Sequence, residues 1–223
     1  MDSLRVLLWW VVAIFIGATA ATAMGGMTTQ CVEGNGKVGS EMRNLPPFTQ
    51  IQADGVFEIG VTCGRKQRVQ ITAETNLLPR IQMRVQNQTL VIGTDTSVCA
   101  KKELRIDIHV PRLERLSADG AVDAVVADIR SERFVLDLAG SGNATLAGQA
   151  GRLDARLTGA GDLYAAGLMT RHASVSLEGA GQATVHATQR LEATIEGTGD
   201  ITVYGHPEKI IENISGVGEV LRR

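Results

Sequence analysis

The sequence predicts an all-β protein, a right-handed parallel β-helix built as a two-sheet solenoid with about 20 residues per coil. Two observations support this fold class. Short glycine turns recur through the second half of the chain at intervals of 18 to 20 residues, and apolar and polar residues alternate between them as in half-buried strands. The right hand follows because crossovers between parallel strands are nearly always right-handed. The turns begin at Gly120, Gly140, Gly159, Gly179, Gly197 and Gly216.

The alternation assigns a face to each residue of a strand. Positions two, four and six before a turn are apolar, as in Leu157, Ala155 and Leu153, and their neighbours are polar. Side chains alternate sides along a strand, so we expect the apolar set to face inward and successive coils to lie about 4.8 Å apart. The expected interior column is Leu138, Leu157, Leu177 and Ile195.

The first half of the chain is expected to continue this architecture in longer strands, over residues 36–115, ahead of the regular repeats of residues 116–223. Asn87-Gln88 and the stretch from Gly64 to Gln67 have the composition of turns, and Pro111 ends a strand. No stretch resembles a linker, so residues 36–223 are expected to form a single domain. The strands expected here are Gly36 to Met42, Phe48 to Ala53, Val56 to Thr62, Arg68 to Ala73, Ile81 to Gln86, Thr89 to Gly93 and Leu104 to Val110.

The N-terminus has the pattern of an export signal. Arg5 precedes an apolar run that ends in the small residues Ala21-Thr22-Ala23, so we expect a signal peptide over residues 1–23 and an N-terminal segment over residues 24–35. The alternative is an uncleaved anchor, although the strongly apolar core is short for a membrane span. Cleavage would leave the mature protein in the periplasm, on the cell surface or secreted, with no membrane span.

Three cysteines suit an oxidising compartment, with one disulfide and one spare thiol as the simplest arrangement. Cys63 with Cys99 is one pairing, Cys31 with Cys63 is another, and three unpaired thiols are the third possibility. No cysteine or histidine spacing predicts a metal site, and no motif predicts a cofactor.

Polar residues stand directly after the glycine corners and are expected to form a column along one edge. A functional interpretation is a shallow site for a cation or for sugar hydroxyls. The alternative is that short polar side chains hydrogen-bond the backbone of the turns. The candidate binding residues of this column are Asn143, Asp162, Gln182 and Asp200.

A second column is expected on an outward, flat face two residues further on. Threonines with one aromatic residue suit docking of a carbohydrate or a protein, but the β-propensity of these residues would select the same types. Its members are Thr145, Tyr164, Thr184 and Thr202.

Composition and pattern exclude some classes of function. The net charge of −2 and the lack of a basic patch argue against nucleic-acid binding. Short uniform coils offer no cleft walls, so we expect no catalytic residues and no enzyme, with a carbohydrate-active enzyme as the alternative. Glu212 interrupts the inward apolar residues of the last coil, so this coil is expected either to be capped or to pair with a second copy along residues 220–222.

Three further motifs carry a resemblance to a known family: Phe48-x-x-Ile51-x-Ala53-Asp54-Gly55, Asn76-Leu77-Leu78-Pro79-Arg80-Ile81 and Val110-Pro111-x-Leu113. Together with the glycine corners, these residues resemble the bacterial head GIN domain family, whose members are labelled auto-transporter adhesins. The resemblance implies an exported β-helix without established catalytic residues and with a role in cell-surface adhesion. We therefore expect a non-enzymatic binding or scaffolding domain of the bacterial envelope, with an envelope protein or a glycan as its partner.

Overall fold

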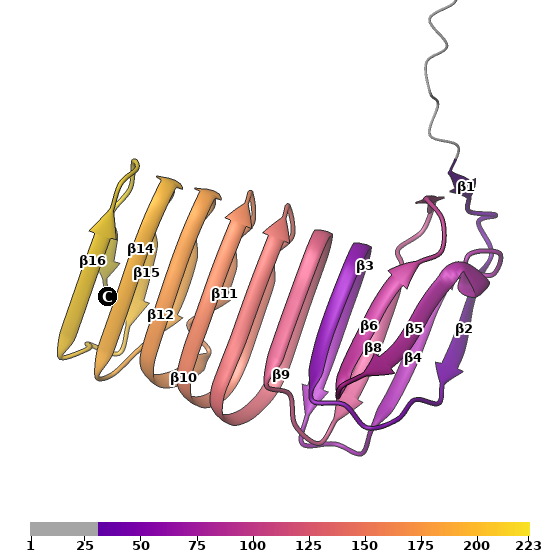
Figure 1. Cartoon of the computed structure of the whole chain (residues 1–223), viewed down its shortest axis with the longest axis horizontal. Helices are drawn as coiled ribbons and strands as arrows, with labels where there is room; N and C mark the ends of the chain where they lie inside the picture. Colours follow the sequence, from indigo (N-terminus) through magenta and orange to yellow (C-terminus); the bar gives the residue numbers. More distant parts are fainter. Residues whose placement is uncertain (1–30) are drawn as a thin grey trace, which may run out of the picture.

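The computed structural model describes residues 31–223 of the chain. The expected signal peptide at residues 1–23 lies outside the described residues, as does most of the segment at residues 24–35. The strands stand side by side in a long row, with β2 at one end and the C-terminus at the other (Figure 1). The first eight strands are β1 (Val32–Glu33), β2 (Val38–Arg43), β3 (Gln50–Cys63), β4 (Arg68–Glu74), β5 (Ile81–Gln86), β6 (Thr89–Thr94), β7 (Val98–Cys99) and β8 (Arg105–Val110).

Nine further strands make up the rest of the row, and a short 3₁₀ helix, η1 (Leu78–Arg80), precedes β5. The first two of the nine are long because each runs around a bend of the chain. They are β9 (Arg115–Gly140), β10 (Ala144–Gly159), β11 (Leu163–Ala165), β12 (Leu168–Ala180), β13 (Ala183–His186), β14 (Arg190–Thr198), β15 (Ile201–Tyr204), β16 (Lys209–Ile214) and β17 (Val220–Arg222).

The predicted right-handed parallel β-helix, a two-sheet solenoid, is wrong. Within the described residues, 15 strands form one sheet in which antiparallel and parallel pairings are mixed. Strand β4 is antiparallel to both β2 and β8, and β5 is antiparallel to β6. Residues 36–115 therefore do not continue the architecture of the second half in longer form.

A tight turn explains the antiparallel hairpin of β5 and β6. Asn87 and Gln88 are the two residues between these strands, and both have positive φ, 49° and 61°. Two central residues with positive φ define the hairpin turn that matches the twist of the flanking strands. Parallel neighbours need a much longer crossover than two residues can provide, so this turn imposes the antiparallel arrangement.

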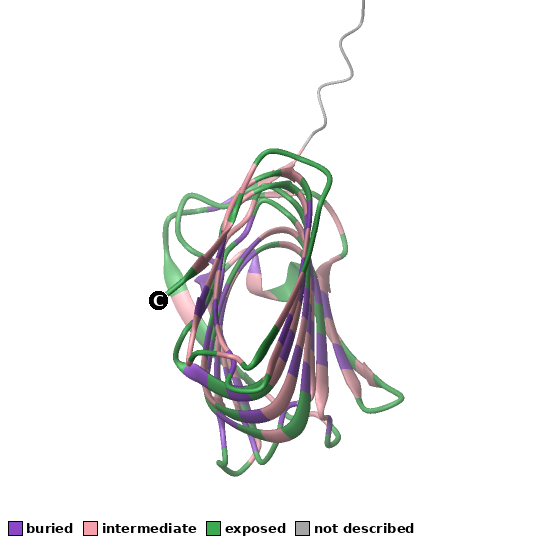
Figure 2. Ribbon diagram, turned by 90° about the vertical axis from the view of Figure 1, so that its left-hand side faces the viewer, coloured by how far each residue is buried: buried purple, intermediate pink, exposed green. Residues whose placement is uncertain are grey.

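From β9 onward, neighbouring strands pair in parallel. Leu157 on β10 lies beside Leu138 of β9 and Leu177 of β12, and Leu177 lies beside Ile195 of β14. All four side chains are buried, so they form the interior column that the glycine spacing predicts. Viewed along the row, the ribbon turns back on itself, and buried positions recur along it (Figure 2).

Close stacking at the corners explains the recurrent glycines. Gly159 has a φ of +117°, and a Cβ on Gly161 would lie 2.1 Å from the carbonyl oxygen of Gly142. A side chain at Gly161 would therefore separate neighbouring passes of the chain, and one at Gly159 would in addition be strained by its backbone conformation.

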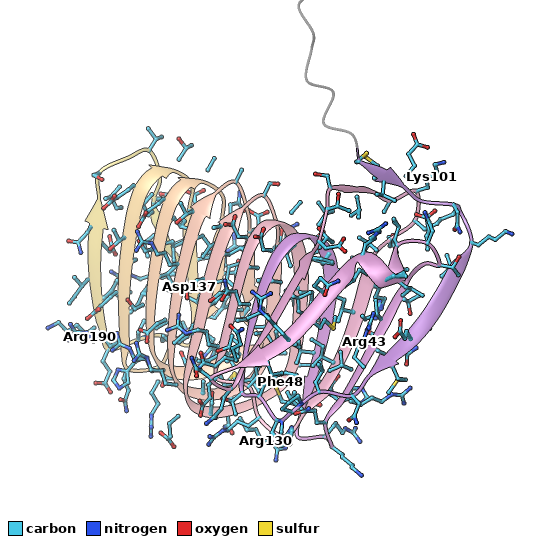
Figure 3. All side chains as sticks on the ribbon, turned by 45° about the vertical axis from the view of Figure 1, so that its right-hand side comes forward. Arg43, Phe48, Lys101, Arg130, Asp137 and Arg190 are labelled. Atoms are coloured by element: carbon cyan, nitrogen blue, oxygen red, sulfur yellow. A yellow bond between two sulfur atoms is a disulfide. The ribbon has the colours of Figure 1, made fainter. Side chains whose placement is uncertain are left out.

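One apolar core runs through the described chain, from Phe48 near its start to Val203 near its end. Aliphatic side chains dominate it, and Phe134 is its largest fully buried side chain. Figure 3 shows the charged side chains outside this core, among them Arg130 and Arg190 near the lower edge of the row. No helix in residues 31–223 has the length and hydropathy that a membrane span requires.

Charged residues on the last two strands lie at the end of the apolar core. Glu212 on β16 lies beside the inward Ala193, and Arg222 on β17 lies beside the inward Val203. The Nη2 atom of Arg222 is 3.4 Å from the Oε1 atom of Glu212, so an ion pair spans the end of the core. Glu212 thus has the position of the expected polar cap. Pairing with a second copy along residues 220–222 stays a prediction.

Candidate functional site

The polar residues after the corners form a connected column of hydrogen bonds. The backbone N–H of Asn143 donates to Asp123 Oδ1 at 3.0 Å, and that of Asp162 donates to Asn143 Oδ1 at 3.2 Å. The next step repeats the pattern, because the Gln182 N–H donates to Asp162 Oδ1 at 2.8 Å. These side chains therefore satisfy the backbone of the adjacent turn, which supports the structural interpretation of this column.

The last polar residues after the corners are connected by the same kind of hydrogen bond. The backbone N–H of Glu219 donates to Asp200 Oδ1 at 3.0 Å. One carboxylate oxygen of Asp162 and one of Asp200 therefore accept a hydrogen bond from the backbone of a neighbouring turn. Within residues 31–223, no group of three or more histidine, cysteine or acidic side chains is arranged to hold a metal ion.

The outward column lies where the alternation places it. Thr145, Tyr164 and Thr184 are in register on β10, β11 and β13, and Thr202 follows on β15. Tyr164 is half exposed. Its hydroxyl donates to Asp162 Oδ2 at 3.0 Å, which joins the two columns and raises the pKa of Tyr164 through that hydrogen bond and through the negative charge of Asp162. The predicted residues thus meet on one surface.

Both predicted pairings, Cys63 with Cys99 and Cys31 with Cys63, are wrong. Cys31 pairs with Cys99, and Cys63 is a buried free thiol. The pairing follows from β1 and β7, which lie side by side so that Val32 is next to Val98 and Glu33 next to Cys99. Burial raises the pKa of Cys63 to about 11, so this thiol is not a nucleophile near neutral pH.

A buried carboxylate fixes the same end of the molecule. Glu74 is fully buried and accepts hydrogen bonds from the backbone N–H groups of Gly36, Lys101 and Lys102. Burial by itself raises the pKa of Glu74, but these three donors outweigh it, and the pKa lies below its ordinary value. A Cβ on Gly34 would overlap the carboxylate, so this position is restricted to glycine.

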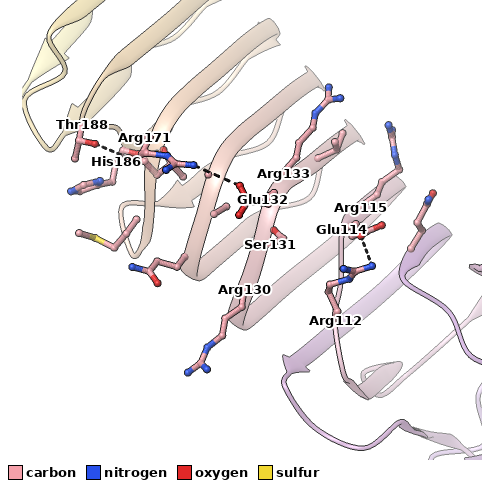
Figure 4. Close-up of a pocket in the computed structure, with 17 residues that line it drawn as sticks. Arg112, Glu114, Arg115, Arg130, Ser131, Glu132, Arg133, Arg171, His186 and Thr188 are labelled. Carbon is pink, nitrogen blue, oxygen red and sulfur yellow. Dashed lines mark hydrogen bonds and ion pairs between the residues drawn. The ribbon is translucent and has the colours of Figure 1, made fainter.

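The structure also contains a groove that the sequence did not predict. Its volume is about 1030 Å³, and it lies along the bends opposite the glycine corners. Five arginines and two glutamates line it, so the expectations of no cleft and no basic patch are wrong (Figure 4). We call this feature the arginine groove. The charged residues of its lining are Arg112, Glu114, Arg115, Arg130, Glu132, Arg133 and Arg171.

Ion pairs hold part of this lining in place. Arg171 Nη2 lies 3.6 Å from Glu132 Oε2, and Arg112 Nη2 lies 2.8 Å from Glu114 Oε1. Arg130 makes no ion pair with any described residue and is exposed. In Figure 4, Arg130 extends to one side of the groove while Arg115 and Arg133 extend to the other. Guanidinium groups therefore border the groove on both sides.

A column of cationic and imidazole side chains continues beyond the groove. The register places Arg133 beside Arg152, Arg152 beside His172, His172 beside Arg190 and Arg190 beside Lys209. Their spacing along the sequence matches the glycine period, so a signal for this column was present. The net charge of −2 concealed it, because acidic residues lie beside these cations: Asp154 pairs with Arg133 and Arg152, and Glu192 pairs with Arg190.

Comparison with known protein families matches residues 47–207 to the family described as "Putative auto-transporter adhesin, head GIN domain". This match confirms the resemblance drawn from the sequence. No curated protein matches the chain.

Several solved structures share the fold. A "putative adhesin" from Bacteroides fragilis is 23% identical, with a TM-score of 0.73 over 86% of this chain and 100% of its own. A "putative lipid binding protein" from Parabacteroides distasonis is 18% identical, with a TM-score of 0.55 over 87% of this chain and 100% of its own. A "putative adhesin" from Parabacteroides merdae is 21% identical, with a TM-score of 0.50 over 86% and 98%. Identities this low establish a common fold alone.

Proposed function

This chain belongs to the head GIN domain family, and we propose that it is an exported binding module of the bacterial envelope that acts in cell-surface adhesion and catalyses no reaction. The description of the family as adhesins supports the adhesive role. The names of two structural neighbours, in Bacteroides fragilis and Parabacteroides merdae, point the same way.

The observation that carries the proposal is the outward column, in which Thr145 and Tyr164 are exposed and Thr184 and Thr202 are half-buried. Parallel pairing sets these side chains at a regular spacing of about 4.8 Å on adjacent strands. Val125 on β9 extends the column by one step and is 54% exposed. A rigid, partly apolar face of this kind loses little conformational entropy when it docks against a partner.

Export is the second part of the proposal. The Cys31–Cys99 disulfide supports it, because disulfides persist in oxidising compartments such as the periplasm and the cell surface. The export signal expected in residues 1–23 is consistent with the same compartment and stays a prediction.

An adhesion assay tests the proposal. The full chain is displayed on a non-adherent bacterial host, and the retained cells are counted on immobilised envelope glycans and on whole bacterial cells. We expect display to increase retention, and Tyr164→Ala with Thr184→Ala to reduce it. The matched control is Ser174→Ala with Thr194→Ala, two part-buried hydroxyl residues on β12 and β14.

Two results would argue against this function. One is retention no greater than that of the host without the displayed chain. The other is an equal loss for the column variant and the control variant, which would locate adhesion elsewhere or attribute the loss to folding.

A further inference from the structure

The arginine groove concentrates positive charge on a chain that is slightly acidic overall. Five arginines and two glutamates line the groove, whereas the net charge of the whole chain is −2. Four of the arginines have a carboxylate partner within the chain, since Arg112 pairs with Glu114, Arg115 with Asp137, Arg133 with Asp154 and Arg171 with Glu132. Arg130 makes no ion pair with a described residue, and unpaired positive charge beside other cations attracts an anion. Arg130 is exposed, and Arg133 is exposed as well although its Nε atom donates to Asp154 Oδ2, so the Nη atoms of Arg133 are the donors it can offer to a ligand.

We propose that the arginine groove binds a linear acidic polysaccharide, with its carboxylate or sulfate groups held by Arg130, Arg133 and their neighbours. This site is separate from the outward column of threonines and Tyr164, and it goes beyond the adhesive function proposed above. Guanidinium groups suit such a ligand because their planar fork donates two parallel hydrogen bonds to one carboxylate or sulfate.

The length of the groove favours a polymer over a single small anion. Its lining comes from five successive passes of the chain, which contribute residues near positions 114, 132, 150, 170 and 187. Four steps between strands span about 19 Å. The column of Arg133, Arg152, His172, Arg190 and Lys209 runs across neighbouring strands in the same direction. Cations repeated along a line match charges repeated along a polymer.

The groove also offers partners for sugar hydroxyls. Gln149 and the carboxylate of Glu132 lie in its lining, and each can accept a hydrogen bond from a hydroxyl. Ser131 Oγ and His186 Nδ1 are buried lining atoms that have no hydrogen-bond partner in the described structure. Buried polar atoms are normally satisfied, so both retain unused hydrogen-bonding capacity at this site.

Gly151 shapes the middle of the groove. Its missing side chain leaves the space in which Arg171 reaches Glu132, because a Cβ there would lie 3.1 Å from Glu132 Oε2 and 3.2 Å from Arg171 Nη2. The ion pair thus crosses the intervening pass of the chain. Met169, which is 48% exposed, adds an apolar surface beside it for the face of a sugar ring.

The chemistry of the lining distinguishes this ligand from a nucleic acid. Proteins that hold single strands stack bases on aromatic side chains, and the groove contains no phenylalanine, tyrosine or tryptophan among its described residues. A membrane rich in anionic lipid is a different class of partner that would also attract arginine, and the test below separates it.

The test measures binding of the purified chain to polygalacturonate and to dextran sulfate, with uncharged dextran as the neutral reference, at 0.15 M salt. We expect the acidic polymers to bind and dextran not to bind. The double variant Arg130→Gln, Arg133→Gln should weaken binding by about tenfold or more, since it removes two charge-assisted contacts. The variant removes the ion pair of Arg133 with Asp154, but Asp154 keeps its ion pair with Arg152, so the fold should persist.

The matched control is Lys37→Gln with Arg84→Gln, which removes two exposed cations that do not line the groove. It should leave the affinity within about twofold. Equal weakening by both double variants, or no binding of either acidic polymer, would overturn the proposal. Tighter retention by phosphatidylglycerol vesicles than by the acidic polymers would overturn it as well, in favour of a lipid surface.

Discussion

The carboxylate of Asp162 accepts a hydrogen bond of 2.8 Å from the backbone N–H of Gln182, its counterpart at the next corner of the chain. The other carboxylate oxygen accepts the hydroxyl of Tyr164 at 3.0 Å. One side chain therefore supports a turn and orients the exposed aromatic residue of the outward column.

Replacing Asp162 tests this double role. Asp162→Ala should lower the free energy of unfolding by about 1 kcal/mol, the usual contribution of such hydrogen bonds. It should also lower the pKa of Tyr164, because the hydrogen bond and the charge of Asp162 raise it. The pKa is measured by ultraviolet titration in a Tyr204→Phe background, where Tyr164 is the only tyrosine. An unchanged titration would contradict the contact.

The glycine corners provide a second prediction. Gly161→Ala should destabilise the fold by roughly 2–4 kcal/mol, because the new Cβ would lie 2.1 Å from the carbonyl oxygen of Gly142. Thr158→Ala, at an exposed position three residues earlier, should change stability by about 0.5 kcal/mol or less. Urea unfolding measures both variants. Similar midpoints for the two would show that the corners do not stack this closely.

The disulfide yields a third prediction. Cys31 and Cys99 are 68 residues apart, and opening a loop of that size should lower the free energy of unfolding by about 4 kcal/mol in the chain-entropy account. Cys31→Ser with Cys99→Ser, measured by urea unfolding, tests this value. Cys63 should resist maleimide at pH 8 in the native protein, since burial raises its pKa to about 11. Rapid native labelling of Cys63 would contradict its burial.

A fourth prediction concerns acid stability. The pKa of Glu74 in the folded protein lies below its ordinary value of 4.5. As the pH falls, the unfolded chain therefore binds a proton at Glu74 at a higher pH than the folded protein does. The stabilisation of the fold by the ionised Glu74 is complete above the unfolded-state pKa and is lost as the pH falls from 4.5 through the folded-state pKa.

Glu74→Gln should remove this part of the pH dependence, whereas Glu103→Gln, an exposed acid on the same loop as Lys101 and Lys102, should retain it. Unfolding free energies measured between pH 2 and pH 7 compare the two variants. Parallel curves for Glu74→Gln and the unaltered chain would show that the buried carboxylate does not control acid stability.

Periodicity made part of the fold predictable. Leu157 lies beside Leu138 and Leu177 because the glycine turns recur at nearly constant spacing, and alternation identified which side chains are buried. The first half has no such period. There the composition of Asn87 and Gln88 indicates a turn, but their positive φ, which imposes an antiparallel hairpin, is a property of the folded backbone.

The candidate sites also differ in how far the sequence predicts them. Tyr164 and Thr184 could be assigned to one column because both lie within the regular repeat. Cys31 meets Cys99 through two strands of two residues each, which are too short to leave a pattern in the sequence. The arginine groove combines Arg112, which lies between β8 and β9, with Arg130 inside β9, so it emerges only when the passes of the chain are placed side by side.

The most direct test of binding without catalysis follows the ligand over time. The purified chain is incubated with polygalacturonate, and polymer length and new reducing ends are measured alongside the bound fraction. We predict a bound polymer of unchanged length. Shortened chains and a steady rise in reducing ends, abolished by substitutions in the groove, would contradict the account and identify the protein as an enzyme.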